Sequence, residues 1–443
     1  MVVNSRICAG FPPPRAAIAL AAVLWTSWGL ASDISTHAPS SRLRQWQDAK
    51  LGLFIHFGPW SQTENGSIWK MAQVSQAQRE EYFSLYKTFN PTRFDARRLA
   101  ALAKRAGMKY VVFTTKHHDG FCNFDSALTD FKVTSPVCPT SASPHPDLTR
   151  DVVDAFRAQG LMVGLYYSHV DWHHPGGGWH HDAKLDPSFL AEHPDRWRDY
   201  VAYETGQVRE LLTRYGPIDI FWFDIFWPQE GMADATPMLR MMRQLQPDML
   251  INNRGTGEFG DFITPEQGVP DKPYPQPWET CMTISDGPGF WYKGPNARYK
   301  STAQIVRLLA DVASKGGNLL LGVGPKADGT LPPEETERLE QVGRWLDRNG
   351  QAIYGTTGSS LDVVPSWGRV TRKGSRVFLI VFEWPADGSP LRLRLTQAVK
   401  RAGVLGENAA VICRRGGDSG EVEIERPSAQ ADGMPIVVEL ELK

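Results

Sequence analysis

The sequence is poor in cysteine and has no excess of positive charge, and each absence excludes a class of protein. Only five of the 443 residues are cysteine, and no two of them have the CxxC spacing typical of structural zinc sites. The 48 lysines and arginines are offset by 49 aspartates and glutamates, whereas a protein that binds a phosphate backbone needs a basic excess. We therefore expect neither a zinc-stabilised module nor a nucleic-acid-binding protein.

The sequence also lacks long apolar runs and the common motifs of several enzyme classes. Beyond residue 32, no stretch of 18 uninterrupted apolar residues occurs, so we expect no membrane-spanning helix in the mature chain. The GxSxG motif of serine hydrolases, the phosphate-binding P-loop and the HExxH motif of zinc peptidases are absent. A serine-triad hydrolase and a P-loop nucleotidase are therefore set aside, and the spacing of the histidines and cysteines predicts no metal site.

The first 32 residues have the pattern of a secretory signal. Arg6 and Arg15 supply positive charge, and no acidic residue occurs before Asp33. The apolar run Ala16–Leu30 is about 15 residues long, which is short for a membrane span. At its end, Gly29 and Ala31 give the small-x-small pattern that a cleavage site requires. We predict that residues 1–32 are cleaved and that the protein is secreted or periplasmic. An uncleaved membrane anchor is the alternative.

Signal cleavage would remove Cys8 and leave four cysteines in the mature protein. These are Cys122, Cys138, Cys281 and Cys413, which are widely spaced. In an oxidising compartment Cys122 and Cys138 could form a local disulfide, but the sequence leaves their pairing open.

From Leu51 to about residue 350, short apolar runs alternate with amphipathic helical patterns, as in repeated βα units. The runs are nearly continuously apolar, which is typical of parallel strands that are buried on both faces. The predicted strands are Leu51–Gly58, Lys109–Lys116, Leu161–Ser168, Ile218–Asp224, Asp248–Arg254 and Gly317–Pro325. Together with an unassigned stretch over 260–291, they predict an α/β fold, a (β/α)8-like TIM barrel over residues 33–357. A doubly wound open sheet is the alternative.

After residue 357 the apolar pattern changes to a period of two. Short alternating segments such as Arg376–Trp384, Leu391–Leu395 and Pro435–Leu442 are separated by Gly, Pro, Asp and Ser. This pattern predicts a C-terminal antiparallel β-sandwich over residues 358–443, in which no candidate catalytic residue is apparent.

The predicted barrel strands end in polar residues, which a barrel would gather on one rim. Asp224 ends the aromatic run IFWFD, where desolvation of a lone carboxylate is costly. A carboxylate in such a place is a candidate functional residue. Capping of a helix, or an ion pair with Arg254, would explain it equally well. A second carboxylate, Glu266 or Glu279, follows in the unassigned stretch. Two carboxylates on one barrel rim suit glycoside cleavage.

Histidines lie at the ends of the predicted strands, but their spacing does not favour a metal site. The adjacent residues His117 and His118 would point in opposite directions in an extended chain, and no metal-binding spacing accompanies them. We expect His56, His117 and His118 instead to be neutral and to bond sugar hydroxyls, although histidines satisfied within the core are equally common.

With these residues assigned, the chain resembles the α-L-fucosidases of glycoside hydrolase family 29. The motifs that carry the resemblance span residues 45–357 in the family's order. They are KLGLFIHFGPWS, GMKYVVFTTKHHDGFCNFDS, GLYYS, WFD, NNRG, TPEQ, PWETCMTI, SKGGNLLLGVGPKADGT and AIYGT. The resemblance implies a catalytic barrel followed by a β-sandwich, and hydrolysis of terminal α-L-fucose from a fucosylated glycan with retention of configuration and without a cofactor. It does not fix the oligomeric state.

The resemblance also implies roles for individual residues. Asp224 matches the catalytic nucleophile, and Glu266 best matches the acid/base, with Glu279 as the alternative. The residues that match the fucose pocket are His56, Trp69, His117, His118, Tyr166, Trp222, Arg254 and Phe290, the last against the C6 methyl group.

Two positions depart from the family pattern. Ile68 precedes Trp69 where many relatives have a glutamate, and Glu64 is the nearby residue that could replace it. Trp291 stands where a glycine is more usual. Two other functions therefore stay open: a secreted retaining glycosidase for another sugar, and a fucose-binding protein without catalytic activity.

Overall fold

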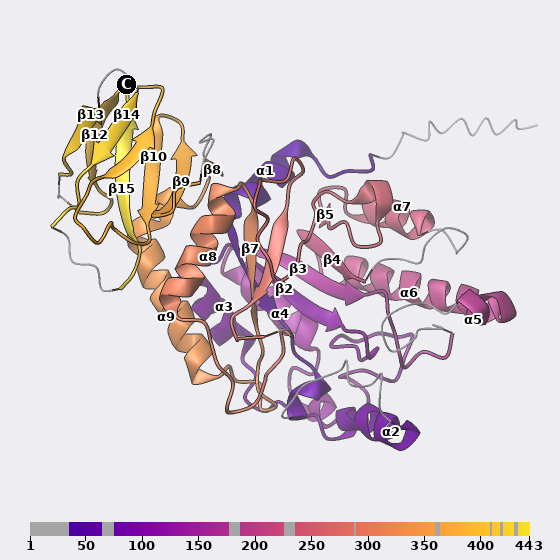
Figure 1. Cartoon of the computed structure of the whole chain (residues 1–443). Helices are drawn as coiled ribbons and strands as arrows, with labels where there is room; N and C mark the ends of the chain where they lie inside the picture. The colour runs from indigo at the N-terminus through magenta and orange to yellow at the C-terminus, as the bar shows by residue number, and fades with distance from the viewer. Residues whose placement is uncertain are drawn as a thin grey trace, which may run out of the picture. The chain divides into compact units, whose positions relative to one another are not determined.

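A seven-stranded parallel sheet forms the part of the chain that carries most of the predicted motifs (Figure 1). Its strand order is β5-β4-β3-β2-β1-β7-β6. The strands are β1 Leu51–Ile55, β2 Tyr110–Lys116, β3 Met162–Ser168, β4 Ile220–Asp224, β5 Leu250–Ile251, β6 Glu279–Thr283 and β7 Asn318–Val323. The six predicted strands are confirmed in place and in parallel pairing, although β5 is much shorter than predicted. The seventh, β6, lies in the stretch that the sequence left unassigned.

The computed structural model describes residues 35–63, 75–176, 187–225, 235–287, 289–358, 364–407, 410–416, 420–428 and 433–443. The predicted signal sequence and the positions Glu64, Ile68 and Trp69 lie outside these residues. Within the described part of the chain, no helix combines the length and the apolar character that a membrane span requires.

The helices accompany the parallel strands and begin and end at recognisable signals. They are α1 Ser40–Ala49, α2 Gln76–Ser84, α3 Ala96–Arg105, α4 Leu148–Ala158, α5 Pro187–Glu192, α6 Pro194–Arg214, α7 Thr236–Leu245, α8 Thr302–Ser314 and α9 Pro333–Asn349. The carboxylate of Asp95 accepts the backbone N–H of Arg98 at the start of α3, and Ser301 forms a capping box at the start of α8. Gly107, after α3, has a φ of 82°, which a glycine adopts without steric cost.

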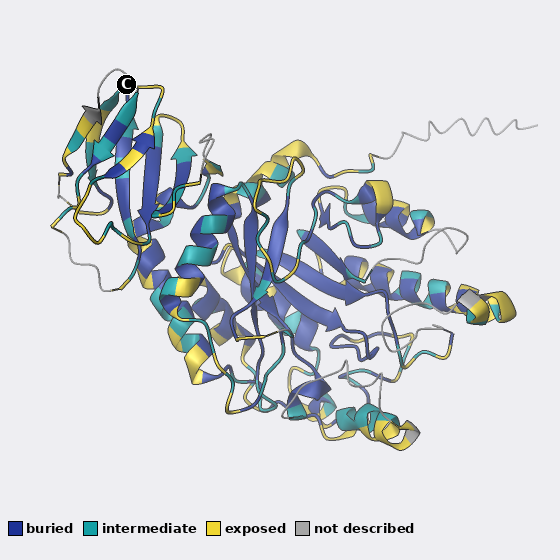
Figure 2. Ribbon diagram, in the orientation of Figure 1, coloured by how far each residue is buried: buried dark blue, intermediate teal, exposed yellow. Residues whose placement is uncertain are grey.

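Side chains alternate between the two faces of the parallel sheet. Leu53 of β1 and Phe221 of β4 belong to an apolar cluster shared with the helices, whereas Phe54 and Trp222 belong to a second cluster on the opposite face. Figure 2 shows the strands as continuously buried, as expected for a sheet covered on both faces. Residues just beyond the strand ends that lie on the same face as Phe54 and Trp222 are therefore directed toward one common site.

An irregular segment, 261–267, lies between the two end strands of the sheet. The backbone N–H of Asp261 donates to Ile251 of β5 (2.7 Å), and the N–H of Glu279 in β6 donates to Ile263 (2.9 Å). Parallel bridges also join Asn252 to Phe262 and Glu266 to Cys281. Backbone pairing therefore continues from β5 through this segment to β6 and fixes Glu266 beside the end of β6.

The C-terminal residues form two antiparallel sheets, as the period-two pattern predicts. One has the order β12-β15-β10-β9-β8 and the other β11-β14-β13. Their strands are β8 Thr357–Gly358, β9 Gly368–Lys373, β10 Arg376–Val381, β11 Leu391–Arg394, β12 Val399–Val404, β13 Cys413–Gly416, β14 Glu421–Ile424 and β15 Ile436–Leu442. Residues of both sheets, such as Leu379 and Ile424, share one apolar cluster.

The cysteines are all free thiols in the part of the chain that the structure describes. Cys122 and Cys138 are buried, and their sulfurs lie against the backbone carbonyls of Gly120 and Phe89. The question that the sequence left open is thereby answered, because these two cysteines form no disulfide with each other.

Candidate active site

The carboxyl ends of the parallel strands surround a cavity of about 420 Å³. The residues that line it are Phe54, His56, His117, His118, Tyr166, Trp222, Asp224, Ile225, Arg254, Glu266, Cys281, Gly289, Phe290 and Trp291. Every predicted site residue in the described part of the chain is among them except Glu279. The strand alternation explains why: Trp222 and Asp224 are two residues apart on β4, and Phe54 and His56 are two residues apart at β1.

Asp224 lies at the end of β4 and accepts hydrogen bonds on both carboxylate oxygens. Its Oδ1 accepts from Arg254 Nη1 (2.5 Å) and from the backbone N–H of Ile225 (2.8 Å), and its Oδ2 accepts from the Tyr166 hydroxyl (2.6 Å). Ile225 has a φ of 62°, which is rare for a β-branched residue, and this strained turn directs its N–H at the carboxylate. The Asp224 side chain is thus held in one orientation.

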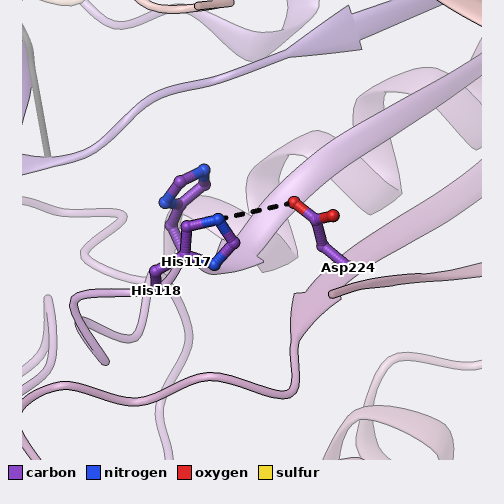
Figure 3. Close-up of side chains that lie close together, drawn as sticks. All are labelled: His117, His118 and Asp224. Carbon is purple, nitrogen blue, oxygen red and sulfur yellow. Dashed lines mark ion pairs between the residues drawn. The ribbon is translucent and has the colours of Figure 1, made fainter. Parts of the chain in front are cut away.

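The charges around Asp224 keep it ionised. Burial raises the pKa of this carboxyl, but the Arg254 guanidinium, His118 and the Tyr166 hydroxyl together lower it well below its usual range. His118 Nε2 lies 3.7 Å from Asp224 Oδ2, and Figure 3 shows the two side chains directed toward each other. An ionised, mostly enclosed carboxylate with fixed orientation is suited to nucleophilic attack.

Arg254 connects the two carboxylates of the cavity. Its Nη2 donates to Glu266 Oε2 (3.0 Å), while its Nη1 holds Asp224. Its guanidinium lies 4.5 Å from the centre of the Trp222 ring, and Thr264 accepts its Nε–H. The ion pair between Asp224 and Arg254 that the sequence left open as a structural alternative is therefore present, inside the cavity wall.

The two carboxylates differ sharply in their exposure. The Asp224 side chain is 13% exposed, whereas the Glu266 side chain is 45% exposed. The first therefore lies at the bottom of a water-poor site and the second at its opening. This difference in exposure suits Asp224 to nucleophilic attack and Glu266 to proton transfer.

Glu279 lies beneath the cavity and does not line it. It is buried, and its carboxylate accepts hydrogen bonds from the Tyr110 hydroxyl (2.5 Å) and from the indole N–H of Trp222 (3.0 Å). Burial raises its pKa to about 7. Glu279 therefore supports the ring on which Arg254 lies, and the geometry favours Glu266 over Glu279 for contact with a substrate.

The side chains of His117 and His118 do not point in opposite directions, so that expectation is wrong. Strand β2 ends at Lys116, and the two histidines lie in the turn that follows, with ring centroids 4.1 Å apart. The carbonyl of His117 accepts from Gly120 N and that of His118 from Trp172 N, while the buried Lys116–Asp171 ion pair anchors the strand end. The alternation argument failed because the chain is no longer extended at these residues.

All three histidines of the cavity are neutral at neutral pH. Burial lowers the pKa of His56 to about 3, that of His118 to about 4 and that of His117 well below its usual value. The Nδ1 atoms of His56 and His117 are buried and have no hydrogen-bond partner within the described residues. Because both rings line the cavity and are neutral, each can offer a ligand hydroxyl one N–H donor and one nitrogen acceptor.

His117, His118 and Asp224 could also act as metal ligands, since one atom from each lies within 4.8 Å of the others (Figure 3). A cation in their midst would, however, compete with the Arg254 guanidinium, which already binds Asp224 at 2.5 Å. The donor set therefore suits a neutral polyhydroxy ligand better than a metal ion.

An apolar wall faces these polar groups. The ring of Phe290 is buried and stacks on His56 with a centroid distance of 4.9 Å, and Phe54 lies 5.3 Å from it. A Cβ at Gly322 would come within 2.2 Å of the Phe290 ring, so a glycine is needed there. Phe54 was not predicted from the sequence, although its place two residues before His56 is a usable signal. Cys281 was not predicted either, because its strand was not assigned.

A parallel sheet whose strand ends carry two carboxylates, neutral hydrogen-bonding histidines and aromatic rings defines a glycoside hydrolase. The family model "Alpha-L-fucosidase" matches residues 32–351. The tissue α-L-fucosidase of Homo sapiens is 32% identical over 79% of this chain and 78% of its own length. The chain belongs to the α-L-fucosidase family.

Two solved structures share this fold. The α-L-fucosidase isoenzyme 1 of Paenibacillus thiaminolyticus has a TM-score of 0.79 and 36% identity, covering 91% of this chain and 99% of its own. A family 29 α-L-fucosidase of Bacteroides thetaiotaomicron, described as a trapped covalent intermediate with 2-fluoro-fucosyl fluoride, has a TM-score of 0.78 and 25% identity, covering 93% and 99%.

Proposed function

We propose that this protein is a retaining exo-α-L-fucosidase that removes terminal α-L-fucose from fucosylated glycans by a double displacement. The observation that carries the proposal is the pair Asp224 and Glu266 on one guanidinium, the first ionised and mostly enclosed and the second exposed. A retaining glycosidase needs this division between a nucleophile and an acid/base.

In the first step, Asp224 would attack the anomeric carbon and form a covalent fucosyl ester. The bond to the leaving oxygen breaks, and Glu266 donates the proton that this oxygen needs. In the second step, Glu266 takes a proton from water, whose oxygen attacks the same carbon and releases the Asp224 carboxylate. Arg254 holds both carboxylates in place throughout and offsets their negative charge.

The cavity wall supports L-fucose as the sugar. Fucose is a 6-deoxy sugar with one methyl group and several hydroxyls. Phe290 and Phe54 offer an apolar surface for the methyl group, and the neutral rings of His56 and His117, which line the cavity, offer hydrogen-bond partners for the hydroxyls. A site built to bond hydroxyl groups discriminates strongly against sugars that place them differently.

We also propose the finer features of the fold. The segment 261–267 would serve as an irregular eighth strand that closes the parallel sheet into a (β/α) barrel, since it is bonded to β5 on one side and to β6 on the other. The two antiparallel sheets would form a β-sandwich around their shared apolar cluster.

The proposed activity makes a direct prediction about substrates and products. The protein should hydrolyse an aryl α-L-fucoside, and NMR of the first product should show α-fucose. The aryl β-L-fucoside and the aryl α-L-rhamnoside are the matched controls and should be poor substrates. Comparable turnover of all three would indicate another sugar, and binding of L-fucose without any turnover would indicate a non-catalytic protein.

We further propose that the chain is exported and leaves the membrane after cleavage near Ser32 or Asp33. The support is the charge and apolar pattern of Arg6 to Ala31. N-terminal sequencing of protein from the culture medium or periplasm should begin at Ser32 or Asp33. A chain that begins at Met1 in the membrane fraction would mean an anchor instead.

A further inference from the structure

Of the described residues that line the cavity, five are not fully buried. Asp224 lies at the end of β4, and the other four form the rim: Ile225, Glu266, Gly289 and Trp291. Of these, Trp291 has the largest apolar side chain. An indole at the opening of a polar cavity is a favourable surface for a flat ring.

The loop that carries Trp291 is tied to the strand ends by several hydrogen bonds. Ser285 and Tyr299 pair as an antiparallel bridge at its base. The ammonium group of Lys293 donates to the carbonyls of Asp286 and Gly287, both at 2.8 Å, and that of Lys300 donates to the carbonyls of Thr283 (2.6 Å) and Ser285 (3.1 Å). These bonds hold the loop in place before any ligand arrives.

Two glycines leave the space that Trp291 occupies. Gly289 has a φ of 91°, and a Cβ there would come within 2.5 Å of the indole ring. A Cβ at Gly324 would come within 2.3 Å of the Trp291 backbone. The neighbouring residue Phe290 is buried against His56, so the two consecutive aromatic residues divide the cavity between floor and rim.

The leaving group of the reaction must pass this rim. Glu266, which would protonate the leaving oxygen, is itself a rim residue, and the fucose pocket below is closed by buried side chains. Whatever is attached to that oxygen therefore extends past Glu266 into the opening. Among the residues that the structure describes, Trp291 and Ile225 are the apolar side chains at this opening.

Building on the proposed function, we propose that Trp291 forms the wall of a leaving-group subsite. Its ligand class is a ring with an apolar face that is attached to the fucose, either an aryl group or a pyranose. Because hydrogen bonds already order the backbone at the base of the loop that carries Trp291, the loop loses little conformational entropy when a ring stacks on the indole. The subsite would favour substrates with a ring at this position over those with a small leaving group.

The test compares leaving groups with and without a ring. We expect Trp291→Ala to lower kcat/KM for 4-nitrophenyl α-L-fucoside by about 3- to 10-fold, the range of a lost aromatic contact. The kcat/KM for α-L-fucosyl fluoride and the inhibition constant of free L-fucose should stay unchanged, since neither has a ring at this place. Trp291→Phe, which keeps a ring, should recover most of the loss.

Two further variants serve as controls. Tyr274→Ala removes an exposed aromatic residue outside the cavity and should change neither substrate's kinetics. Trp291→Leu keeps apolar bulk without a flat ring, so it tests the subsite if the alanine variant folds poorly, and it should retain the defect.

The outcomes separate the subsite from the proposed function. An equal loss on both substrates, or no loss on either, would overturn the subsite while wild-type activity on both fucosides keeps the fucosidase assignment. If the wild-type protein hydrolyses neither fucoside, the proposed function fails, and the subsite fails with it.

Discussion

Replacement of Asp224 by glycine is expected to lower kcat for an aryl α-L-fucoside by about 10³- to 10⁵-fold, because it removes the oxygen that attacks the anomeric carbon. Binding of L-fucose should survive, since His56, His117 and Phe290 are unchanged. Arg254 would keep Glu266 as its second carboxylate partner, which limits the disturbance of the site. The measurements are kcat for the aryl fucoside and the inhibition constant of L-fucose.

Azide gives this prediction a second readout. The glycine variant leaves a small space beside the Arg254 guanidinium, which attracts an anion. Azide in that space would form a carbon–nitrogen bond as the aryloxide leaves, and the expected product is β-fucosyl azide. Asp224→Asn is the matched control, since it removes the charge without opening the space and should gain no activity from azide. Near-normal activity of a folded Asp224→Gly variant would contradict the assignment of the nucleophile.

The sequence was most informative where burial imposes a pattern. Strands such as β2 and β4 are covered on both faces, so their apolar runs stand out and their ends can be located. The alternation along β4 then places Asp224 on the same face as Trp222. For this reason Asp224 could be placed in the site from residue order alone, whereas its role as nucleophile was implied only by the family resemblance.

The pattern was weakest where backbone pairing is irregular or a strand lies at an edge. The segment 261–267 contributes isolated bridges rather than a regular strand, so it has no apolar run, although it carries Glu266. In the C-terminal sheets, β8 has two residues and β12 is an edge strand with exposed charges. These strands and β9 were not anticipated.

The choice between Glu266 and Glu279 could not be made from the sequence because it depends on burial. Both residues belong to one unassigned stretch, 13 positions apart. Only the fold shows that Glu279 is enclosed by Tyr110 and Trp222, while Glu266 reaches the opening of the cavity. His117 and His118 lie just past the predicted end of their strand, and their convergence depends on the turn that follows β2, which the sequence did not specify.

The role of Glu266 leads to a prediction that depends on the leaving group. Glu266→Ala should lower kcat/KM for a fucosylated disaccharide by about 10²- to 10⁴-fold, because its leaving alcohol departs only with a proton. For α-L-fucosyl fluoride or a dinitrophenyl fucoside, the loss should be far smaller, since these groups depart without one. The measurement is kcat/KM across the leaving-group series.

Glu279→Gln is the matched control for this series. Glutamine keeps one acceptor for the Trp222 indole and one donor toward Tyr110, so the packing beneath the cavity should be largely preserved. Because Glu279 does not line the cavity, the variant should change kcat/KM by the same factor for every leaving group. If instead the loss of kcat/KM grows with poorer leaving groups in Glu279→Gln and not in Glu266→Ala, the acid/base is Glu279.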